Sequence, residues 1–173
     1  TEILQPSLYS LLKMMLVGLP MDSDRVNEVH MILAAKEKVL QERIQTNPIT
    51  ILFNDRLRVD TCVAANKKLK KLVKTVENFK DVVFNPNSHQ QIGNLLFDML
   101  QLPVLATTKA KGRATGADVL EDLKNHTKEP DVLDLLQHLV DLAEVVKING
   151  TFIKAFMQEK DFLHGNLRLG GTQ

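Results

Sequence analysis

The residues best suited to chemistry in this sequence are basic, and the first group of them follows a helical spacing. Four lysines, which we call the lysine group, fall at positions i, i+3, i+4 and i+7 of a predicted helix: Lys67, Lys70, Lys71 and Lys74. Lysines at this spacing share one helix face, where like charges cost about 0.2–0.5 kcal/mol per i,i+4 pair. A polyanion would relieve this cost. A solvated lysine face that only aids solubility is the alternative.

A second basic group lies in a polar loop predicted at residues 107–114, directly before a helix start. Its members, which we call the basic loop, are Lys109, Lys111, Arg113, Thr115 and Gly116. Cationic side chains beside free backbone N–H groups at a helix N-terminus suit a phosphate group. The pattern therefore predicts phosphate contacts, and a solvent-exposed loop without a ligand is the alternative.

The motifs of common catalytic and metal centres do not occur in the sequence. The five histidines form no H-E-x-x-H motif, and the single cysteine, Cys62, has no second cysteine for a zinc pair. There is no G-x-G-x-x-G, no G-x-x-x-x-G-K-[ST] and no G-x-S-x-G. We therefore expect no catalytic centre and no bound metal or cofactor in this chain, and we expect Cys62 to be a small buried hydrophobic residue.

Charge is strongly segregated along the chain, although the net charge is only +1. Between Arg56 and Arg113 there are eleven Lys and Arg residues against four Asp and Glu residues. Between Asp118 and Glu144 there are two against eight. A molecule with such poles can bind a polyanion on one side while it remains nearly neutral overall.

The composition is that of one ordinary soluble domain, with 173 residues, 44% hydrophobic and 25% charged. The single cysteine favours a reducing, cytosolic compartment. No apolar run approaches the roughly 20 residues that a membrane-spanning helix needs, and the first residues lack the pattern of a signal peptide. The chain starts without Met and ends in a stretch, residues 169–173, that closes no predicted element. We expect it to be part of a longer protein.

The elements that must position these residues are predicted to be mainly α-helical. Helices are predicted from Pro6 to Gly18, from Asp22 or Ser23 to Asn47, from Asn87 or Ser88 to Leu100, from Thr115 to Leu123, and from Glu129 to about Met157. Thr115 and Asp118 have the spacing of a capping box. Alternation around Asn54-Asp55 predicts a small β-hairpin at residues 51–59, and a helix at about 60–80 carries the lysine group.

Five segments, in order along nearly the whole chain, resemble DNA polymerase family A. Residues 84–98 are similar to the F-N-x-N-S-x-x-Q-[LI]-x-x-[LV]-L-F segment of that family, and residues 108–121 resemble its Lys-Thr…Ser-Thr-x-x-x-Val-Leu-Glu stretch. The other three are residues 11–22, 147–153 and 163–167. The resemblance implies that residues 1–173 are a single thumb subdomain built on antiparallel long helices. It also implies a tip insertion at 46–83, which contains the β-hairpin, and the start of the connection into the palm at 160–173.

In that family the thumb grips the backbone and minor groove of the primer–template duplex, while the palm binds two Mg²⁺ ions and the fingers bind the nucleotide. The resemblance implies that this chain binds primer–template DNA in replication and supports processivity, without catalysis of its own. The parent would be a DNA-directed DNA polymerase, a nucleotidyltransferase with Mg²⁺ in its palm. The palm and fingers, in the same chain or a second one, would be its partners in the cytoplasm.

Carried over residue by residue, the DNA-contacting loop of the family falls on the basic loop. The lysine that faces the minor groove near the end of the long helix falls on Lys147, and Asn149 stands where the pattern has a second lysine. Ala114 and Ala143 replace a serine and an arginine that are usual in the family. These differences remove hydrogen-bond donors, so we expect fewer or shifted DNA contacts.

Bacterial members of the family have only a few residues where this chain carries the insertion at 46–83. Some bacteriophage replicative polymerases extend the thumb here, so we expect a phage origin and the cytoplasm of a host cell. The insertion holds the lysine group, which we expect to add phosphate contacts behind the duplex. The alternative function is a helical protein–protein module whose basic helix docks an acidic partner or a processivity factor.

Overall fold

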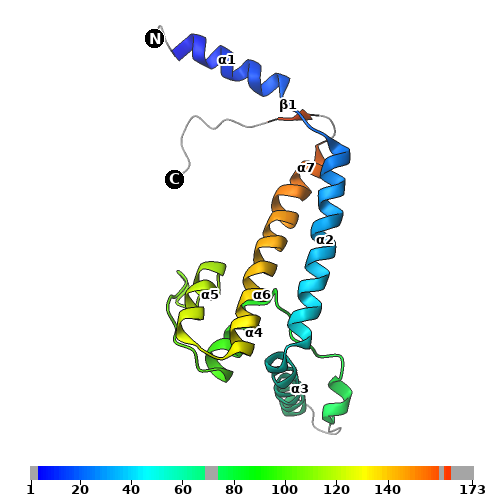
Figure 1. Ribbon diagram of the computed structural model, residues 1–173, viewed down its shortest axis with the longest axis vertical. Helices are drawn as coiled ribbons and strands as arrows, with labels where there is room; N and C mark the ends of the chain where they lie inside the picture. The colour runs from blue at the N-terminus through cyan, green and yellow to red at the C-terminus, as the bar shows by residue number, and fades with distance from the viewer. Residues whose placement is uncertain (1–3, 69–73, 160–161, 165–173) are drawn as a thin grey trace. The chain divides into compact units, whose positions relative to one another are not determined.

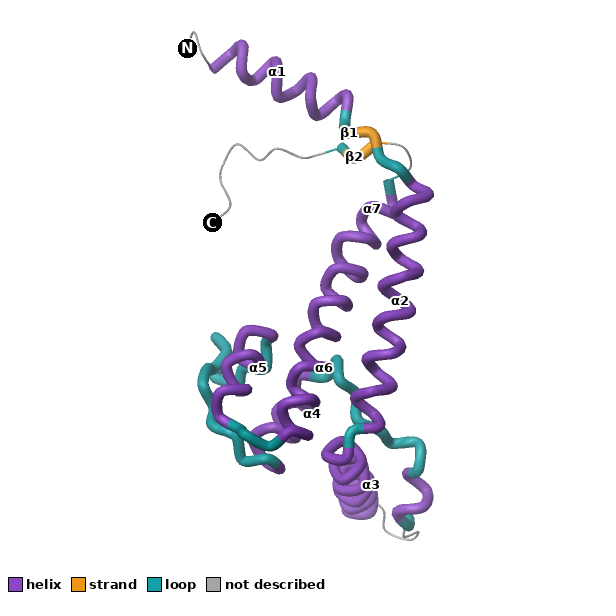
Figure 2. The backbone as a smooth tube through the Cα atoms, in the orientation of Figure 1, coloured by secondary structure: helices purple, strands orange, loops and turns teal. Residues whose placement is uncertain are grey.

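The chain is mainly α-helical, as the sequence predicts (Figure 1; Figure 2, purple). The computed structural model describes residues 4–68, 74–159 and 162–164. The α-helices are α1 (Leu4–Val17), α2 (Ser23–Thr46), α3 (Pro48–Lys68), α4 (His89–Gly93), α5 (Ala117–Leu123), α6 (Pro130–Lys147) and α7 (Lys154–Gln158). The 3-10 helices are η1 (Val76–Phe79) and η3 (Lys124–His126), the π-helices are η2 (Asn94–Met99) and η4 (Ile148–Ile153), and the strands are β1 (Leu19–Pro20) and β2 (Phe162–Leu163).

These elements form two compact units. Unit 1 comprises Thr1–Ala35 and Lys147–Gln173, the two ends of the chain, and unit 2 comprises Lys36–Val146. Among the described residues, every buried apolar side chain except that of Ile153 belongs to unit 2. Unit 2 therefore contains the hydrophobic core, and it also contains the basic loop.

In unit 1, α1 ends as the sequence predicts, at Gly18. The N–H of Gly18 donates to the carbonyl of Met14 at 3.0 Å, and its φ of 72° is the left-handed conformation that glycine adopts easily. A Cβ atom at this position would lie 2.9 Å from the ring of His164, whose Nδ1 atom is 3.0 Å from the carbonyl oxygen of Met15. Gly18 is thus required both by the backbone turn and by the approach of the segment that follows β2.

The first turns of α2 also belong to unit 1, and they begin at the predicted cap. The carboxylate of Asp22 accepts a hydrogen bond from the N–H of Arg25 at 2.9 Å, which satisfies one of the free donors of the first turn. Further along α2, the Nδ1 atom of His30 lies 2.7 Å from the Oδ1 atom of Asn149 in η4. Within unit 1, therefore, α2 lies beside the helix that contains Asn149.

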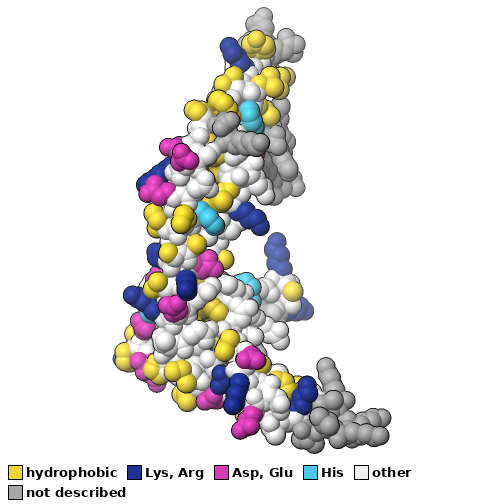
Figure 3. Space-filling model, turned by 90° about the vertical axis from the view of Figure 1, so that its right-hand side faces the viewer, with side chains coloured by type: hydrophobic (Ala, Val, Ile, Leu, Met, Phe, Trp, Pro, Cys, Tyr) yellow, Lys and Arg dark blue, Asp and Glu magenta, His cyan; other side chains and the backbone are white. Residues whose placement is uncertain are grey.

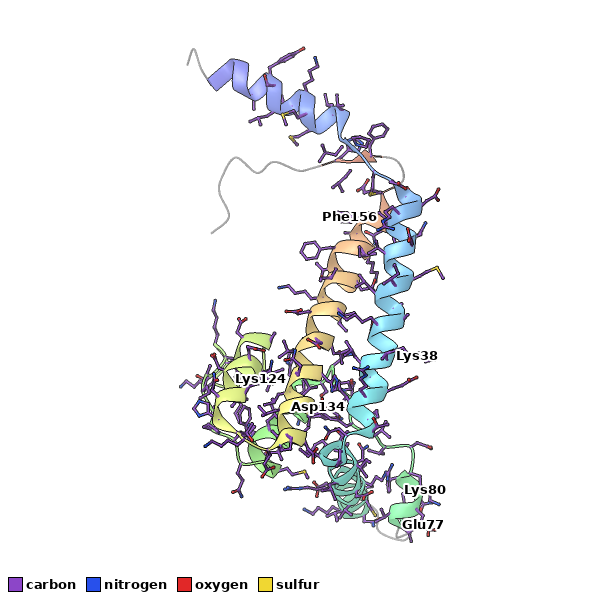
Figure 4. The ribbon with its side chains drawn as sticks, in the orientation of Figure 1. Lys38, Glu77, Lys80, Lys124, Asp134 and Phe156 are labelled. Atoms are coloured by element: carbon purple, nitrogen blue, oxygen red, sulfur yellow. The ribbon has the colours of Figure 1, made fainter. Side chains whose placement is uncertain are left out.

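In unit 2, helix α6 contributes the largest share of the core. It begins at Pro130, as the Glu129-Pro130-Asp131 signal predicts, and the helical chain continues through η4 and α7 to Gln158. Its buried residues are Val132, Leu135, Leu136, His138, Leu139, Val140, Leu142 and Val145. Helix α5 is fastened to α6 by Lys124 (labelled in Figure 4), whose ammonium group donates to Glu121 and, at 2.6 Å, to Gln137.

The β-hairpin predicted at residues 51–59 is wrong, because α3 covers these residues without interruption. The side chain of Asn47 caps this helix by accepting a hydrogen bond from the N–H of Ile49 at 3.0 Å, and Pro48 occupies its first position. The two-stranded antiparallel pair that the structure does contain lies elsewhere, between β1 and β2.

The single helix predicted at about 60–80 is also wrong, because α3 ends at Lys68 and the short η1 follows only at Val76. The side chain of Asn66, near the end of α3, bonds to the backbone of Lys74. Its amide N–H donates to the carbonyl of Lys74 at 2.8 Å and its oxygen accepts from the N–H of Lys74 at 2.8 Å. Cys62, which is 7% exposed and therefore buried as predicted, lies with its sulfur 3.2 Å from the same carbonyl.

Candidate nucleic-acid interface

The basic loop is a short hairpin that closes on itself by backbone hydrogen bonds. Thr107 and Arg113 form an antiparallel bridge, and the N–H of Ala114 donates to the carbonyl of Ala106 at 3.0 Å. At the tip, the N–H of Thr108 donates to the carbonyl of Gly112 at 2.8 Å. The loop that the sequence predicts as irregular therefore has a defined backbone.

Two lysines occupy this tip. Lys109 and Lys111 are exposed, and neither has an ion-pair partner among the residues that the structure describes. Lys111 adopts a left-handed conformation with φ 58°, and its N–H donates to the carbonyl of Thr108 at 2.8 Å. Both ammonium groups are thus carried by an ordered turn and are available to an anionic partner.

Arg113 makes contacts of a different kind, within unit 2. Its Nη1 and Nη2 atoms donate to the two carboxylate oxygens of Asp98 at 2.5 and 2.9 Å, and Nη2 also lies 3.3 Å from the Oδ1 atom of Asn94. The guanidinium carbon lies 5.3 Å from the ring centroid of Phe97, a cation–π arrangement. A forked, two-bond pairing of this type is the strongest form of arginine–carboxylate contact.

Thr115 is buried, with 6% of its surface exposed, and its hydroxyl group lies 2.9 Å from the Nδ1 atom of His89 in α4. The capping box predicted for Thr115 and Asp118 is wrong, because Gly116 is the N-cap residue of α5 and the cap has no side-chain hydrogen bond. Two of the predicted contact residues, Arg113 and Thr115, therefore bond to side chains of the chain itself.

We expect the ion pair between Asp98 and Arg113 to stabilise the folded chain at neutral pH and to lose this effect in acid. Hydrogen bonds from Arg113 hold the pKa of the Asp98 carboxyl below its usual value of about 3.9. Desolvation opposes this effect in part, and the positive charges of Arg113 and Arg56 add smaller lowering effects. Because the pKa is lower in the folded state, the stabilisation is present above about pH 4 and is lost as the pH falls through the folded-state value. The gain is modest, since both side chains are more than a third exposed.

The measurement compares urea unfolding of the wild type with that of Asp98→Asn at pH 7 and at pH 3. We expect the wild type to be the more stable protein at pH 7 and expect the difference to shrink strongly at pH 3. An equal difference at both pH values would contradict an electrostatic role for the pair.

The two other predicted contact residues on the long helix, Lys147 and Asn149, belong to unit 1. Lys147 is exposed at the end of α6. The amide oxygen of Asn149 is bonded to His30, so this side chain joins η4 to α2. Lys147 is thus available to a ligand, whereas Asn149 already has a partner.

The lysine group does not lie on one helix face. Lys67 is exposed in the last turn of α3, and Lys74 follows after the helix, with its ammonium nitrogen 5.7 Å from the ring centroid of Phe79. Lys70 and Lys71 lie outside the described residues. Glu77 and Lys80, labelled in Figure 4, lie at η1 and just beyond it, close to Lys74 in the sequence. On the face shown in Figure 3, Lys and Arg side chains alternate with acidic and apolar ones and form no continuous patch.

Sequence reasoning did not identify Asp98 and His89, the partners of Arg113 and Thr115. Within residues 84–98, His89 falls at an unspecified position of the family pattern and Asp98 follows its last specified position. They lie 26 and 15 residues from Thr115 and Arg113 in the chain. One signal was available: Asp98 is one of only four acidic residues between Arg56 and Arg113. An isolated anion in a basic segment is a natural partner for one of the cations.

The described part of the chain contains neither a metal-binding cluster nor a membrane-spanning helix. Residues 4–68, 74–159 and 162–164 contain no group of three or more His, Cys, Asp or Glu side chains arranged to hold a metal ion. Within these same ranges, no helix combines the length and the apolar character that crossing a membrane requires.

The fold and the loop define a mainly helical domain with an ordered basic hairpin. The sequence model of DNA polymerase family A matches residues 60–172. DNA polymerase I of Geobacillus stearothermophilus is 31% identical over 139 residues, which are 80% of this chain and 15% of that protein. DNA polymerase I of Lactococcus lactis subsp. cremoris is 31% identical over 134 residues, 77% of this chain and 14% of that protein.

A third relative, the thermostable DNA polymerase I of Thermus thermophilus, is 35% identical over 88 residues, which are 50% of this chain and 10% of that protein. The chain belongs to DNA polymerase family A. It spans 15% or less of the length of these three relatives.

Proposed function

We propose that the chain is the thumb of a DNA polymerase and that it binds the primer–template duplex without sequence preference. The observation that carries this proposal is the ordered hairpin of the basic loop, which presents Lys109 and Lys111 to solvent in a member of DNA polymerase family A. Contacts with phosphate supply affinity and positioning, whereas base contacts supply specificity. Lys147 would add a contact from the long helix. Binding of this kind would support processivity in replication.

The parent protein would be a DNA-directed DNA polymerase, a nucleotidyltransferase whose palm binds Mg²⁺ and whose palm and fingers are the partners of this thumb. With DNA as its ligand, the protein would act in the cytoplasm, that of a host cell if its source is a bacteriophage.

The first test is duplex binding by the full 173-residue chain and by its variant Lys109→Gln with Lys111→Gln. Each phosphate contact contributes about 0.9 to the slope of log K against log salt concentration, so the variant should lose about 1.8 of that slope. Fluorescence anisotropy with labelled duplex and single-stranded DNA over a range of salt concentrations measures this.

The matched control for this test is Lys36→Gln with Lys38→Gln. These two exposed lysines lie on α2, outside every predicted contact, and have the same spacing as Lys109 and Lys111. We expect the control to bind as the wild type does. Absence of duplex binding even at low salt would contradict the proposed function.

A second candidate function, the docking of an accessory protein, is favoured by the surface of the insertion. Helix α3 exposes apolar side chains that are between 46% and 61% accessible: Ile51, Leu52, Val59 and Val63. An exposed apolar helix face next to basic residues suits a partner with apolar and acidic groups. In this case the insertion would contribute to processivity through a protein instead of through DNA phosphates.

A further inference from the structure

We propose that Arg113 and Thr115 are positioning residues that fasten the basic loop to α4 and η2 through Asp98 and His89, while Lys109 and Lys111 at the loop tip contact the DNA. The inference rests on the proposed function and deepens it, because it divides the predicted contact residues into two that hold the loop and two that bind. It also gives roles to Asp98 and His89.

The first observation is that the guanidinium group of Arg113 already has strong partners within unit 2. Three of its hydrogen bonds go to Asp98 and Asn94, and one face of the group lies over the ring of Phe97, which is buried. The carboxylate of Asp98 also balances the positive charge of the guanidinium group. A DNA phosphate at this guanidinium group would lie beside the carboxylate of Asp98, which would repel it.

The second observation is that the side chains of Arg113 and Thr115 point toward the same segment of the chain. Arg113 and Thr115 lie two residues apart on the extended arm that leaves the hairpin, and residues two apart in extended backbone point to the same side. Both side chains are directed at the same segment, Arg113 at Asp98 and Asn94 in η2 and Thr115 at His89 in α4. Two attachment points on one arm fix its orientation better than one.

The third observation is that the tip itself makes no such attachment among the described residues. The hydrogen bonds at Thr108, Lys111 and Gly112 stay within the turn and do not attach it to the rest of unit 2. Its orientation relative to the rest of unit 2 therefore depends on the arm. Lys109 and Lys111 can be presented in a fixed position only if Arg113 and Thr115 hold that arm.

A neutral substitution at Asp98 separates this role from a direct phosphate contact by the sign of its effect. If Arg113 contacts phosphate, Asp98→Asn removes a competing anion and should tighten duplex binding. If Arg113 positions the loop, the same change loosens the arm and should weaken binding, by roughly two- to tenfold, the range expected when the order of one or two side chains is lost.

The experiment uses the full 173-residue chain and three variants: Asp98→Asn, Arg113→Asp, and Arg113→Asp combined with Asp98→Arg. Duplex affinity is measured by fluorescence anisotropy at a fixed salt concentration, well below the unfolding temperature of each variant. We expect both single variants to bind more weakly and the charge-swapped pair to recover affinity to within about threefold of the wild type. Tighter binding by Asp98→Asn, or a swapped pair as weak as Arg113→Asp, would overturn the inference.

A second readout needs no DNA. Hydrogen exchange at the amides of Thr108, Gly112 and Ala114 should be faster in Asp98→Asn and should return toward the wild-type rate in the swapped pair. Unchanged exchange in Asp98→Asn means that the pair does not hold the loop, even if DNA binding is observed. Exchange that responds as expected in a chain that does not bind duplex means that the positioning contacts are real and that the proposed function is wrong.

Discussion

Replacing Phe84 by alanine is expected to remove about 3–5 kcal/mol from the free energy of unfolding of unit 2, the usual cost of emptying a buried phenylalanine site. Phe84 is 1% exposed and packs edge-to-face on Phe53 of α3, with ring centroids 5.5 Å apart. Its N–H donates to Asn54 at 2.6 Å and its carbonyl accepts from Gln45 at 2.6 Å. The side chain thus joins α3 to the chain that follows the insertion.

Chemical denaturation of the full chain, followed by circular dichroism, measures this loss. The control is Phe152→Ala, the same substitution at a side chain that is 50% exposed in η4, for which we expect a loss below about 1 kcal/mol. Domains of this size are typically stable by only 5–15 kcal/mol, so the Phe84 variant should lose a large part of its stability. Equal losses in the two variants would show that Phe84 is not a core residue in solution.

Changing all four lysines of the lysine group to glutamine is expected to lower the slope of log K against log salt by up to about 3.6 for duplex DNA, because each phosphate contact contributes about 0.9. This is the largest effect on binding that we expect from any change within residues 46–83. The physical basis is local: Asn66 brings the chain at Lys74 back beside the end of α3, close in the sequence to the exposed Lys67. The measurement is the same anisotropy titration over a range of salt concentrations.

The control for the lysine group is a second fourfold variant in which exposed lysines outside every predicted contact become glutamine: Lys13, Lys36, Lys38 and Lys128. It has the same net charge as the first variant. If both variants lose the same slope, the effect is one of overall charge. If the lysine-group variant keeps the wild-type slope, the predicted phosphate contacts do not form. Docking of an accessory protein is then the better explanation of the lysine group.

Much of the fold could be predicted from local signals because those signals have direct physical causes. Gly18 ends α1 since only glycine adopts its backbone conformation easily, and Asp22 begins α2 since a carboxylate there satisfies a free N–H. Pro130 begins α6 because proline lacks the N–H that would be unpaired at the first position of a helix. Family membership could also be predicted, because five segments of the chain preserve their order.

The wrong prediction of a β-hairpin at residues 51–59 also has a physical cause. The pair Asn47-Pro48 predicts the end of one helix, but an asparagine cap followed by proline in the first position is equally a helix start. Alternation over residues 51–59 then favoured strands, but the buried side of α3 packs Phe53 against Phe84, a contact with a residue thirty-one positions away. Periodicity within a segment carries no information about such a partner.

The partners in the candidate site could not be predicted for the same reason. The sequence places Arg113 in a basic loop, and only the tertiary structure brings Asp98 to it. The expectation that Thr115 caps a helix followed from its spacing to Asp118, whereas burial next to His89 gives its hydroxyl group a different partner. Spacing identifies residues that share an element, but not the element that they contact.

The π-helix η2 bears on how this region can change during evolution. It supplies Asn94, Phe97 and Asp98 to Arg113, and such wide turns usually arise from one extra residue in an α-helix. Deleting a single codon within residues 94–99 would restore ordinary helical winding and remove the wide turn from which these three side chains reach Arg113. A point substitution could not restore that turn. Relatives that lack an acidic residue equivalent to Asp98 should therefore be examined for a one-residue gap before a substitution is assumed.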